Sequence, residues 1–129
     1  MDVPDNLLYT KTHEWARRES DEVNVGITAH AQDELRDVVF VELPKVGKPV
    51  QSKEAVCVIE SVKAAFDIYA PISGTISRVN DKLAKSPGLI NQDCYGEGWL
   101  FAIRANSADE LAVLLSAQDY SKQLEMRAH

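Results

Sequence analysis

The sequence lacks any run of apolar residues close to the roughly 20 needed to cross a bilayer as a helix, so no membrane span is expected. Basic residues are in the minority, with 14 Lys and Arg against 20 Asp and Glu, and the resulting net charge of -6 does not favour nucleic acid or anionic membranes. The start, Met-Asp-Val-Pro-Asp, resembles neither a signal peptide nor an Arg-rich transit peptide. We therefore expect a cytoplasmic protein, or the processed form of a protein of the mitochondrial matrix.

Cysteine and histidine are scarce, and their spacing predicts neither a metal site nor a redox centre. The two cysteines, Cys57 and Cys94, do not form the close pair of a zinc or thioredoxin-type motif. Cys57 stands in the apolar stretch Ala-Val-Cys-Val-Ile, which indicates a buried free thiol. His13, His30 and His129 also lack metal-ligand spacing, and zinc needs three converging ligands. No metal is therefore expected.

Short strands account for most of the pattern that is present. A chain of 129 residues with 45% apolar residues suffices for one core, so we expect one domain over 1–129. Residues 38–41 are apolar on both faces, which predicts a strand buried inside a sandwich. Trp15 and Trp99 are expected to anchor the core. The predicted strands lie at 22–28, 37–43, 54–60, 66–69, 75–79 and 98–104. Gly and Pro separate them, which favours an antiparallel sandwich or barrel.

Helices are predicted in three places. Thr28 suits the N-cap of a short helix that ends at Leu35. Ser107 and Glu110 have the spacing of a capping box, and three leucines follow them as an apolar stripe. Ser116 is placed to cap a final helix. The sequence therefore predicts a helical C-terminal segment over about 107–127.

One lysine stands at the centre of a predicted β-hairpin over about 54–71. Apolar strands flank the segment Glu60-Ser-Val-Lys63-Ala-Ala-Phe-Asp67, so Lys63 falls near the tip. Its small neighbours leave the ε-amine accessible, and Glu60 and Asp67 give the turn an acidic character that a modifying enzyme can recognise. The chain has eight lysines, and most exposed lysines only solvate a surface. Spacing alone does not decide between these interpretations.

The segment resembles the lipoylation site of glycine cleavage H-proteins. Biotin carriers typically place their lysine between methionines, where Val62 and Ala64 stand here, and lipoyl domains of 2-oxoacid dehydrogenases more often have Asp before the lysine. Further blocks resemble the same family in the expected order and together span roughly residues 7–125. They are His-Glu-Trp at 13–15, Val-Gly-Ile-Thr at 25–28, Asp-Val-Val-Phe-Val-Glu-Leu-Pro at 37–44, Pro-Gly-Leu-Ile-Asn at 87–91 and Tyr-Gly-Glu-Gly-Trp-Leu at 95–100.

This resemblance implies a mainly β fold, a hybrid barrel-sandwich of two antiparallel sheets like those of lipoyl and biotinyl carriers, with lipoate attached to Lys63. It implies a non-catalytic carrier, expected to be a monomer, that is modified by a lipoylating enzyme. The carrier would take an aminomethyl group from a pyridoxal-phosphate glycine decarboxylase to a tetrahydrofolate-dependent aminomethyltransferase. Electrons would then pass to dihydrolipoamide dehydrogenase. The cofactor supplies the chemistry and the protein supplies attachment and orientation.

The resemblance also assigns roles to other positions. Glu60 and Gly47 match positions that take part in recognition by the lipoylating enzyme; the alternatives are a surface carboxylate and an ordinary turn glycine. Glu14 and Asp67, with Thr12, match groups that hold the amine of the loaded arm in a surface cleft. The alternative for the two carboxylates is that they are solvated surface charges.

Two departures from the family pattern bear on how the arm docks. Phe66 stands where a small residue is usual, and Cys94 stands where proline or another residue is common, so Cys94 is a labile thiol if it is exposed.

The sequence leaves two other functions open. One is a lipoate carrier of another pathway, such as sulfur oxidation or lipoyl relay, and the other is a scaffold that is not lipoylated.

Overall fold

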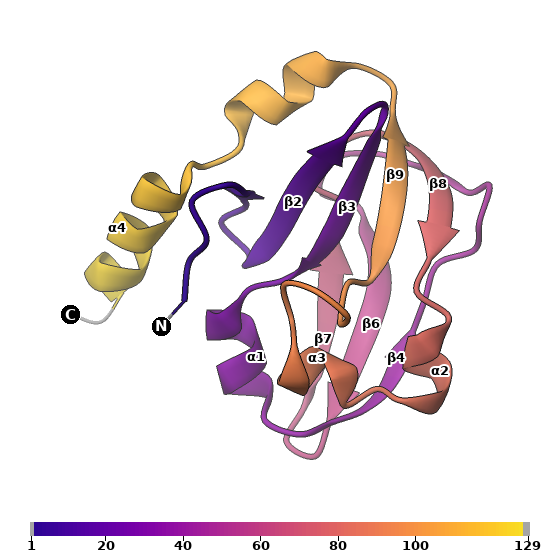
Figure 1. Cartoon of the computed structure of the whole chain (residues 1–129), viewed down its shortest axis with the longest axis vertical. Helices are drawn as coiled ribbons and strands as arrows, with labels where there is room; N and C mark the ends of the chain where they lie inside the picture. The colour runs from indigo at the N-terminus through magenta and orange to yellow at the C-terminus, as the bar shows by residue number, and fades with distance from the viewer. Residues whose placement is uncertain (1, 128–129) are drawn as a thin grey trace.

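Two antiparallel β-sheets form most of the structure, a computed structural model that describes residues 2–127 (Figure 1). The predicted mainly β fold is confirmed. The larger sheet has six strands in the order β1 (Leu8–Tyr9), β2 (Glu14–Glu19), β3 (Glu22–Ile27), β9 (Phe101–Ala105), β8 (Gly74–Val79) and β5 (Pro49–Val50). The smaller sheet has three, in the order β4 (Val38–Glu42), β6 (Ala55–Ser61) and β7 (Ala65–Tyr69).

The predicted burial of β4 on both faces is wrong. Val38 and Val41 are buried, but the side chains of Val39 and Phe40 are 54% and 51% exposed. A β-bulge interrupts the pairing with β6 between Val38 and Phe40. Two consecutive side chains therefore face solvent at the bulge, and alternation resumes beyond it, with Val41 buried and Glu42 exposed.

Both tryptophans were predicted to anchor the core, and of the two only Trp15 is fully buried. Its Nε1 donates a hydrogen bond to the Cys94 carbonyl at 2.9 Å. The indole lies so close to Gly26 that a Cβ there would come within 2.5 Å of the ring, which excludes larger residues. Trp99 is only partly buried, and the Arg78 guanidinium lies 5.2 Å from its ring centroid.

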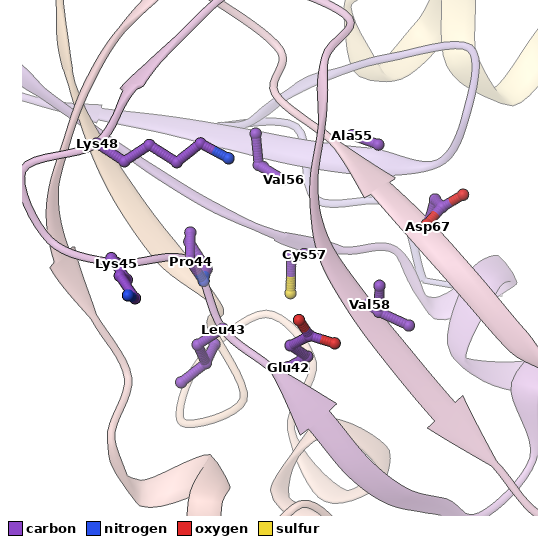
Figure 2. Close-up of a pocket in the computed structure, with 10 residues that line it drawn as sticks. All are labelled: Glu42, Leu43, Pro44, Lys45, Lys48, Ala55, Val56, Cys57, Val58 and Asp67. Carbon is purple, nitrogen blue, oxygen red and sulfur yellow. The ribbon is translucent and has the colours of Figure 1, made fainter.

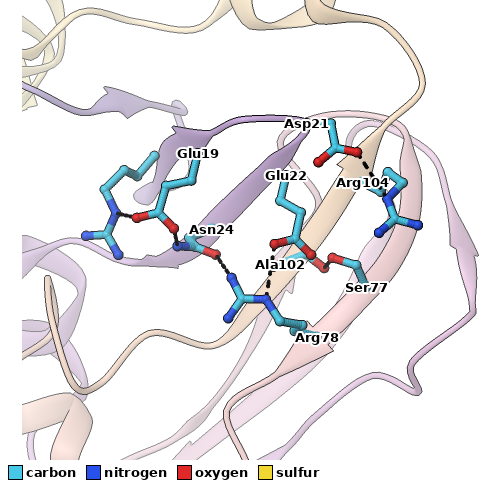
Figure 3. Close-up of polar contacts among 9 residues, drawn as sticks. Glu19, Asp21, Glu22, Asn24, Ser77, Arg78, Ala102 and Arg104 are labelled. Atoms are coloured by element: carbon cyan, nitrogen blue, oxygen red, sulfur yellow. Dashed lines mark hydrogen bonds and ion pairs between the residues drawn. The ribbon is translucent and has the colours of Figure 1, made fainter.

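A polar network covers the outer face of the larger sheet (Figure 3). Arg78 on β8 donates from Nε to Glu22 at 3.1 Å and from Nη2 to Asn24 at 3.0 Å, both on β3. Asn24 in turn donates to Glu19 on β2 at 2.7 Å. A hydrogen bond from Ser77, together with Arg78, lowers the pKa of Glu22. These side chains thus connect β8 to β3 across the intervening β9, and connect β3 to its neighbour β2.

The helices are short, and the predicted caps are confirmed at two of three places. Thr28 Oγ1 accepts from the Ala31 N–H at 3.3 Å and begins α1 (Ala29–Leu35). Ser116 Oγ accepts from the Asp119 N–H at 3.1 Å near the start of α4 (Ala117–Arg127). α2 (Lys82–Lys85) and α3 (Leu89–Gln92) were not predicted. No helix in the described part of the chain is long and apolar enough to cross a membrane.

The capping box predicted at Ser107 does not form. The segment is a 3-10 helix, η1 (Ala108–Val113), and Ser107 caps it by accepting from the Asp109 N–H. Glu110 turns away from this helix start and accepts hydrogen bonds from the N–H of Ser73 at 2.9 Å and from its hydroxyl at 3.2 Å. The carboxylate therefore ties η1 to the loop before β8.

Candidate functional site

Lys63 lies in the short connection between β6 and β7, at one end of the molecule (Figure 1). Its side chain is exposed. The Ser61 hydroxyl closes the turn: it accepts from the N–H groups of Lys63 at 3.2 Å and Ala64 at 3.1 Å. The Ser61 N–H also donates to the Ala64 carbonyl at 2.8 Å. The lysine thus projects from a turn with a defined backbone.

The part that Ser61 plays in ordering this turn was not predicted from the sequence. A serine that begins a tight turn often bonds to N–H groups two or three residues later, and this tendency was the signal available. A further bond, from Val62 N–H to the Asp37 carbonyl at 3.0 Å, holds the turn against the residue that precedes β4. Apolar Val62, with 68% of its surface exposed, flanks Lys63.

A small hollow lies between the hairpin, α1 and the turn before β2. We call it the arm hollow. It brings together Thr12 and Asp67, two of the three residues predicted to hold the loaded arm, with the unusual Phe66 on its wall. Its volume is about 80 Å³, and it is lined by Thr12, His13, Ile27, Ala31, Glu34, Leu35, Phe66, Asp67 and Ile68.

Glu14, the third predicted arm residue, is buried beside this hollow, with only 1% of its surface exposed. Its carboxylate accepts hydrogen bonds from the hydroxyls of Thr10 and Thr12 and from the Tyr69 N–H at 3.1 Å. Burial raises the pKa of Glu14, and the three hydrogen bonds oppose that rise without cancelling it. The alternative of a solvated charge is therefore wrong for Glu14, whereas Asp67 is exposed.

Glu14 and Thr12 also face a larger, mainly apolar hollow on the other side of this turn. It has a volume of about 410 Å³ and lies between β1, the residues before β6 and those around Leu115. Thr12 lines both hollows, while Glu14 lines only the larger one. The Glu14 carboxylate therefore reaches the arm hollow through the Thr12 hydroxyl.

The two predicted recognition residues lie at opposite ends of the small sheet. Glu60 is exposed and pairs with Ala65 next to the lysine turn. β4 runs away from that turn, from Val38 opposite Ser61 to Glu42 opposite Val58, and Gly47 follows its far end. The structure therefore does not bring Gly47 to Lys63. Gly47 has a φ of 92° and donates its N–H to Ile76 at 2.7 Å.

Both cysteines are buried. This confirms the prediction for Cys57 and shows that the Cys94 thiol is not exposed. Figure 2 shows the Cys57 thiol pointing toward the Glu42 carboxylate in a hollow at the far end of β4. Burial, with a contribution from Glu42, raises the pKa of Cys57 to about 12. Burial also raises the pKa of Cys94 to about 11. Neither thiol is prepared to act as a nucleophile.

Two of the histidines, which lack metal-ligand spacing in the sequence, are neighbours in the structure. His13 and His30 meet in space, with ring centroids 4.5 Å apart, and Glu34 joins them. The Thr28 N–H donates to the His13 carbonyl at 3.0 Å, so the turn before β2 lies against the start of α1. A contact between segments so distant in the chain cannot be predicted from the spacing of residues in the sequence. His129 lies outside the described residues.

The two sheets and the lysine at the hairpin tip define the class of fold, a hybrid barrel-sandwich that presents one lysine at the end of a β-hairpin. The sequence profile of the family "Glycine cleavage H-protein" matches residues 7–127. The chain therefore belongs to the glycine cleavage H-protein family.

Individual relatives agree with this assignment. A glycine cleavage system H protein from Thermus thermophilus is 56% identical over 128 residues, covering 99% of this chain and 100% of the relative. One from Rubrobacter xylanophilus is 52% identical and covers 96% of each chain. The crystal structure of a glycine cleavage system H protein from Mycobacterium marinum superposes with a TM-score of 0.88 at 36% identity, covering 95% of this chain and 99% of that one.

Proposed function

We propose that this chain is the lipoyl-bearing carrier of a glycine cleavage system, with lipoate joined as an amide to Lys63 Nζ. The observation that carries the proposal is the exposed Lys63 at a turn closed by Ser61, in a chain of the glycine cleavage H-protein family. Ala64 and Ala65 next to the lysine are small and exposed, so a modifying enzyme has access to the amine.

When bound, the lipoyl group supplies a disulfide that is reduced as it takes up an aminomethyl group. The chain itself is not catalytic: it attaches and orients the group, and it presents the group to three enzymes. They are a pyridoxal-phosphate glycine decarboxylase, a tetrahydrofolate-dependent aminomethyltransferase and dihydrolipoamide dehydrogenase. Attachment at Lys63 makes each encounter with a docked enzyme intramolecular, which raises the effective concentration of the arm.

The arm hollow is the place where the loaded arm rests between enzymes. A protonated amine there meets the exposed carboxylate of Asp67 and the hydroxyl of Thr12, and charge-assisted hydrogen bonds of this kind are strong. Glu14 acts as a positioning residue because its buried carboxylate holds the Thr12 hydroxyl. Phe66 narrows the hollow and limits access of water to the adduct.

Recognition by the lipoylating enzyme falls to Glu60, whose exposed carboxylate stands beside the turn. Gly47 contributes from the far end of β4, so an enzyme that contacts both residues must cover the outer face of the small sheet. The exposed Val39 and Phe40 on β4 are consistent with such a contact. We propose that the carrier works as a cytoplasmic monomer, which keeps the hairpin and the hollow accessible.

Reconstitution with a glycine decarboxylase tests this function. The lipoylated chain, incubated with decarboxylase and glycine, is expected to gain one aminomethyl group, measured by intact mass. The variant Lys63→Arg serves as the control and is expected to gain nothing. A lipoylated chain that takes up no aminomethyl group, while a Thermus H protein does so in parallel, would contradict the assignment to glycine cleavage. Such a result would favour a carrier of another pathway.

A further inference from the structure

We propose that His13, His30 and Glu34 form a binding site for a borderline divalent cation such as Zn²⁺ on the rim of the arm hollow. Within the described part of the chain, one ligand atom from each of the three residues lies within 4.8 Å of the other two. His13 and Glu34 also line the arm hollow. These three side chains indicate the site whether or not the chain bears a lipoyl group or acts as the carrier proposed above.

Two of the ligands come from one face of α1. His30 and Glu34 are separated by four residues, which places their side chains one above the other on a helix. The His30 Nε2 lies 2.5 Å from the Glu34 Oε1. A cation between them requires these atoms to separate to about 3.4 Å, the spacing of ligands around tetrahedral zinc. The Glu34 side chain is 55% exposed, so it can rotate to do so.

The third ligand, His13, is held in place by hydrogen bonds that a metal ligand typically needs. Its Nδ1 lies 2.7 Å from the Tyr120 hydroxyl on α4, and that hydroxyl lies 2.7 Å from Thr28 Oγ1. Metal-binding histidines usually engage their other ring nitrogen in such a bond, which fixes the tautomer and the orientation of the ring. We therefore assign Nε2 of His13 to the cation. The left-handed backbone of His13, with φ 75°, sets the direction of the side chain.

The donor set determines which ion fits. Two imidazoles and one carboxylate suit Zn²⁺, Ni²⁺ or Cu²⁺, whereas Mg²⁺ and Ca²⁺ prefer oxygen ligands throughout. Three protein ligands leave a fourth position of tetrahedral zinc for water or another group. His13 and His30 are partly buried and Glu34 is exposed, so an ion reaches the site from solvent.

Calorimetric titration with ZnCl₂ tests the proposal on the full chain with unmodified Lys63, so that no arm thiols compete. Cys57 and Cys94 are buried and do not compete either. We expect saturable binding of one Zn²⁺ per chain, weakened at least about tenfold in His30→Gln and in Glu34→Gln. Asp33→Asn, which changes a neighbouring exposed carboxylate on α1, should leave the affinity unchanged.

A second measurement uses only the wild-type chain and so does not depend on how the variants fold. Nuclear magnetic resonance of the imidazole C–H groups is expected to show Zn²⁺ shifting the signals of both His13 and His30. MgCl₂ at the same concentration should shift neither. The proposal is overturned if no 1:1 binding is seen, if His30→Gln binds as tightly as wild type, or if Asp33→Asn abolishes binding.

Discussion

The Glu14 carboxylate accepts a hydrogen bond from the Tyr69 N–H at 3.1 Å, and this bond joins β2 of the larger sheet to β7 of the lysine hairpin. The same carboxylate binds the hydroxyls of Thr10 and Thr12. One buried group therefore fixes the turn before β2 relative to the hairpin. These two segments supply Thr12, Phe66 and Asp67 to the arm hollow, so Glu14 fixes the relative positions of these three residues.

Glu14→Gln should change how stability depends on pH. Because burial raises the pKa of Glu14, the folded chain binds a proton on this group in a pH window where the unfolded chain does not. In the wild-type chain the free energy of unfolding therefore falls as the pH rises from the ordinary pKa of glutamate to above the pKa of folded Glu14. The glutamine side chain does not titrate, so the variant does not lose this stability. Urea denaturation from about pH 4 to about pH 7 should show the stability of the variant rising relative to wild type. A pH-independent difference would contradict the assignment.

Ser61→Ala should impair modification of Lys63 more than it impairs folding. The substitution removes the hydroxyl that accepts from the N–H groups of Lys63 and Ala64. If these hydrogen bonds stabilise the ordered turn by about 1 kcal/mol, their loss lowers kcat/KM for lipoylation about fivefold. Ser121→Ala on α4 is the matched control and should leave the rate unchanged. Equal rates for Ser61→Ala and wild type would show that the turn does not present the lysine.

Gly47→Ala should destabilise the fold through the backbone alone. The φ of 92° is unfavourable for alanine, while no heavy atom lies within 4 Å of the added Cβ. We expect a loss of about 1–2 kcal/mol in the free energy of unfolding. Gly88→Ala is the control, because Gly88 has a φ of -64° and equally open surroundings. If both variants lose the same stability, the conformational argument for Gly47 fails.

The two thiols should be unreactive until the chain unfolds. Cys57 and Cys94 are 3% and 9% exposed, and burial raises their pKa values to about 12 and about 11. At about pH 8 neither is ionised to a useful extent, so a disulfide reagent should label none in the native chain and both in guanidinium. Rapid labelling of the native, unlipoylated chain would show that one of these sites opens.

The sequence predicted the parts of the fold that depend on local pattern. Alternating apolar residues identified β3 and β8, and single hydroxyl residues identified the caps at Thr28 and Ser116. β1 and β5 were missed because two residues carry no periodic signal. β2 was missed because charged residues follow Trp15, although Glu14 itself is buried.

The site was predicted only as far as the family resemblance and the hairpin allowed. Lys63 and its exposed neighbours follow from the sequence around them. The burial of Glu14 and the cluster of His13, His30 and Glu34 depend on contacts between segments distant in the chain. The same holds for Glu110, whose local spacing favoured a cap but whose carboxylate binds Ser73. Such contacts are decided by packing, which no local pattern reports.

Intact mass spectrometry of the chain, coexpressed with a lipoylating enzyme and supplied with lipoate, tests the central claim most directly. We expect one added lipoyl group, located on Lys63 by peptide mapping, retained in the matched control Lys53→Arg and absent in Lys63→Arg. An unmodified Lys63, under conditions that lipoylate a Thermus H protein, would contradict the carrier function and would favour a scaffold that is not lipoylated.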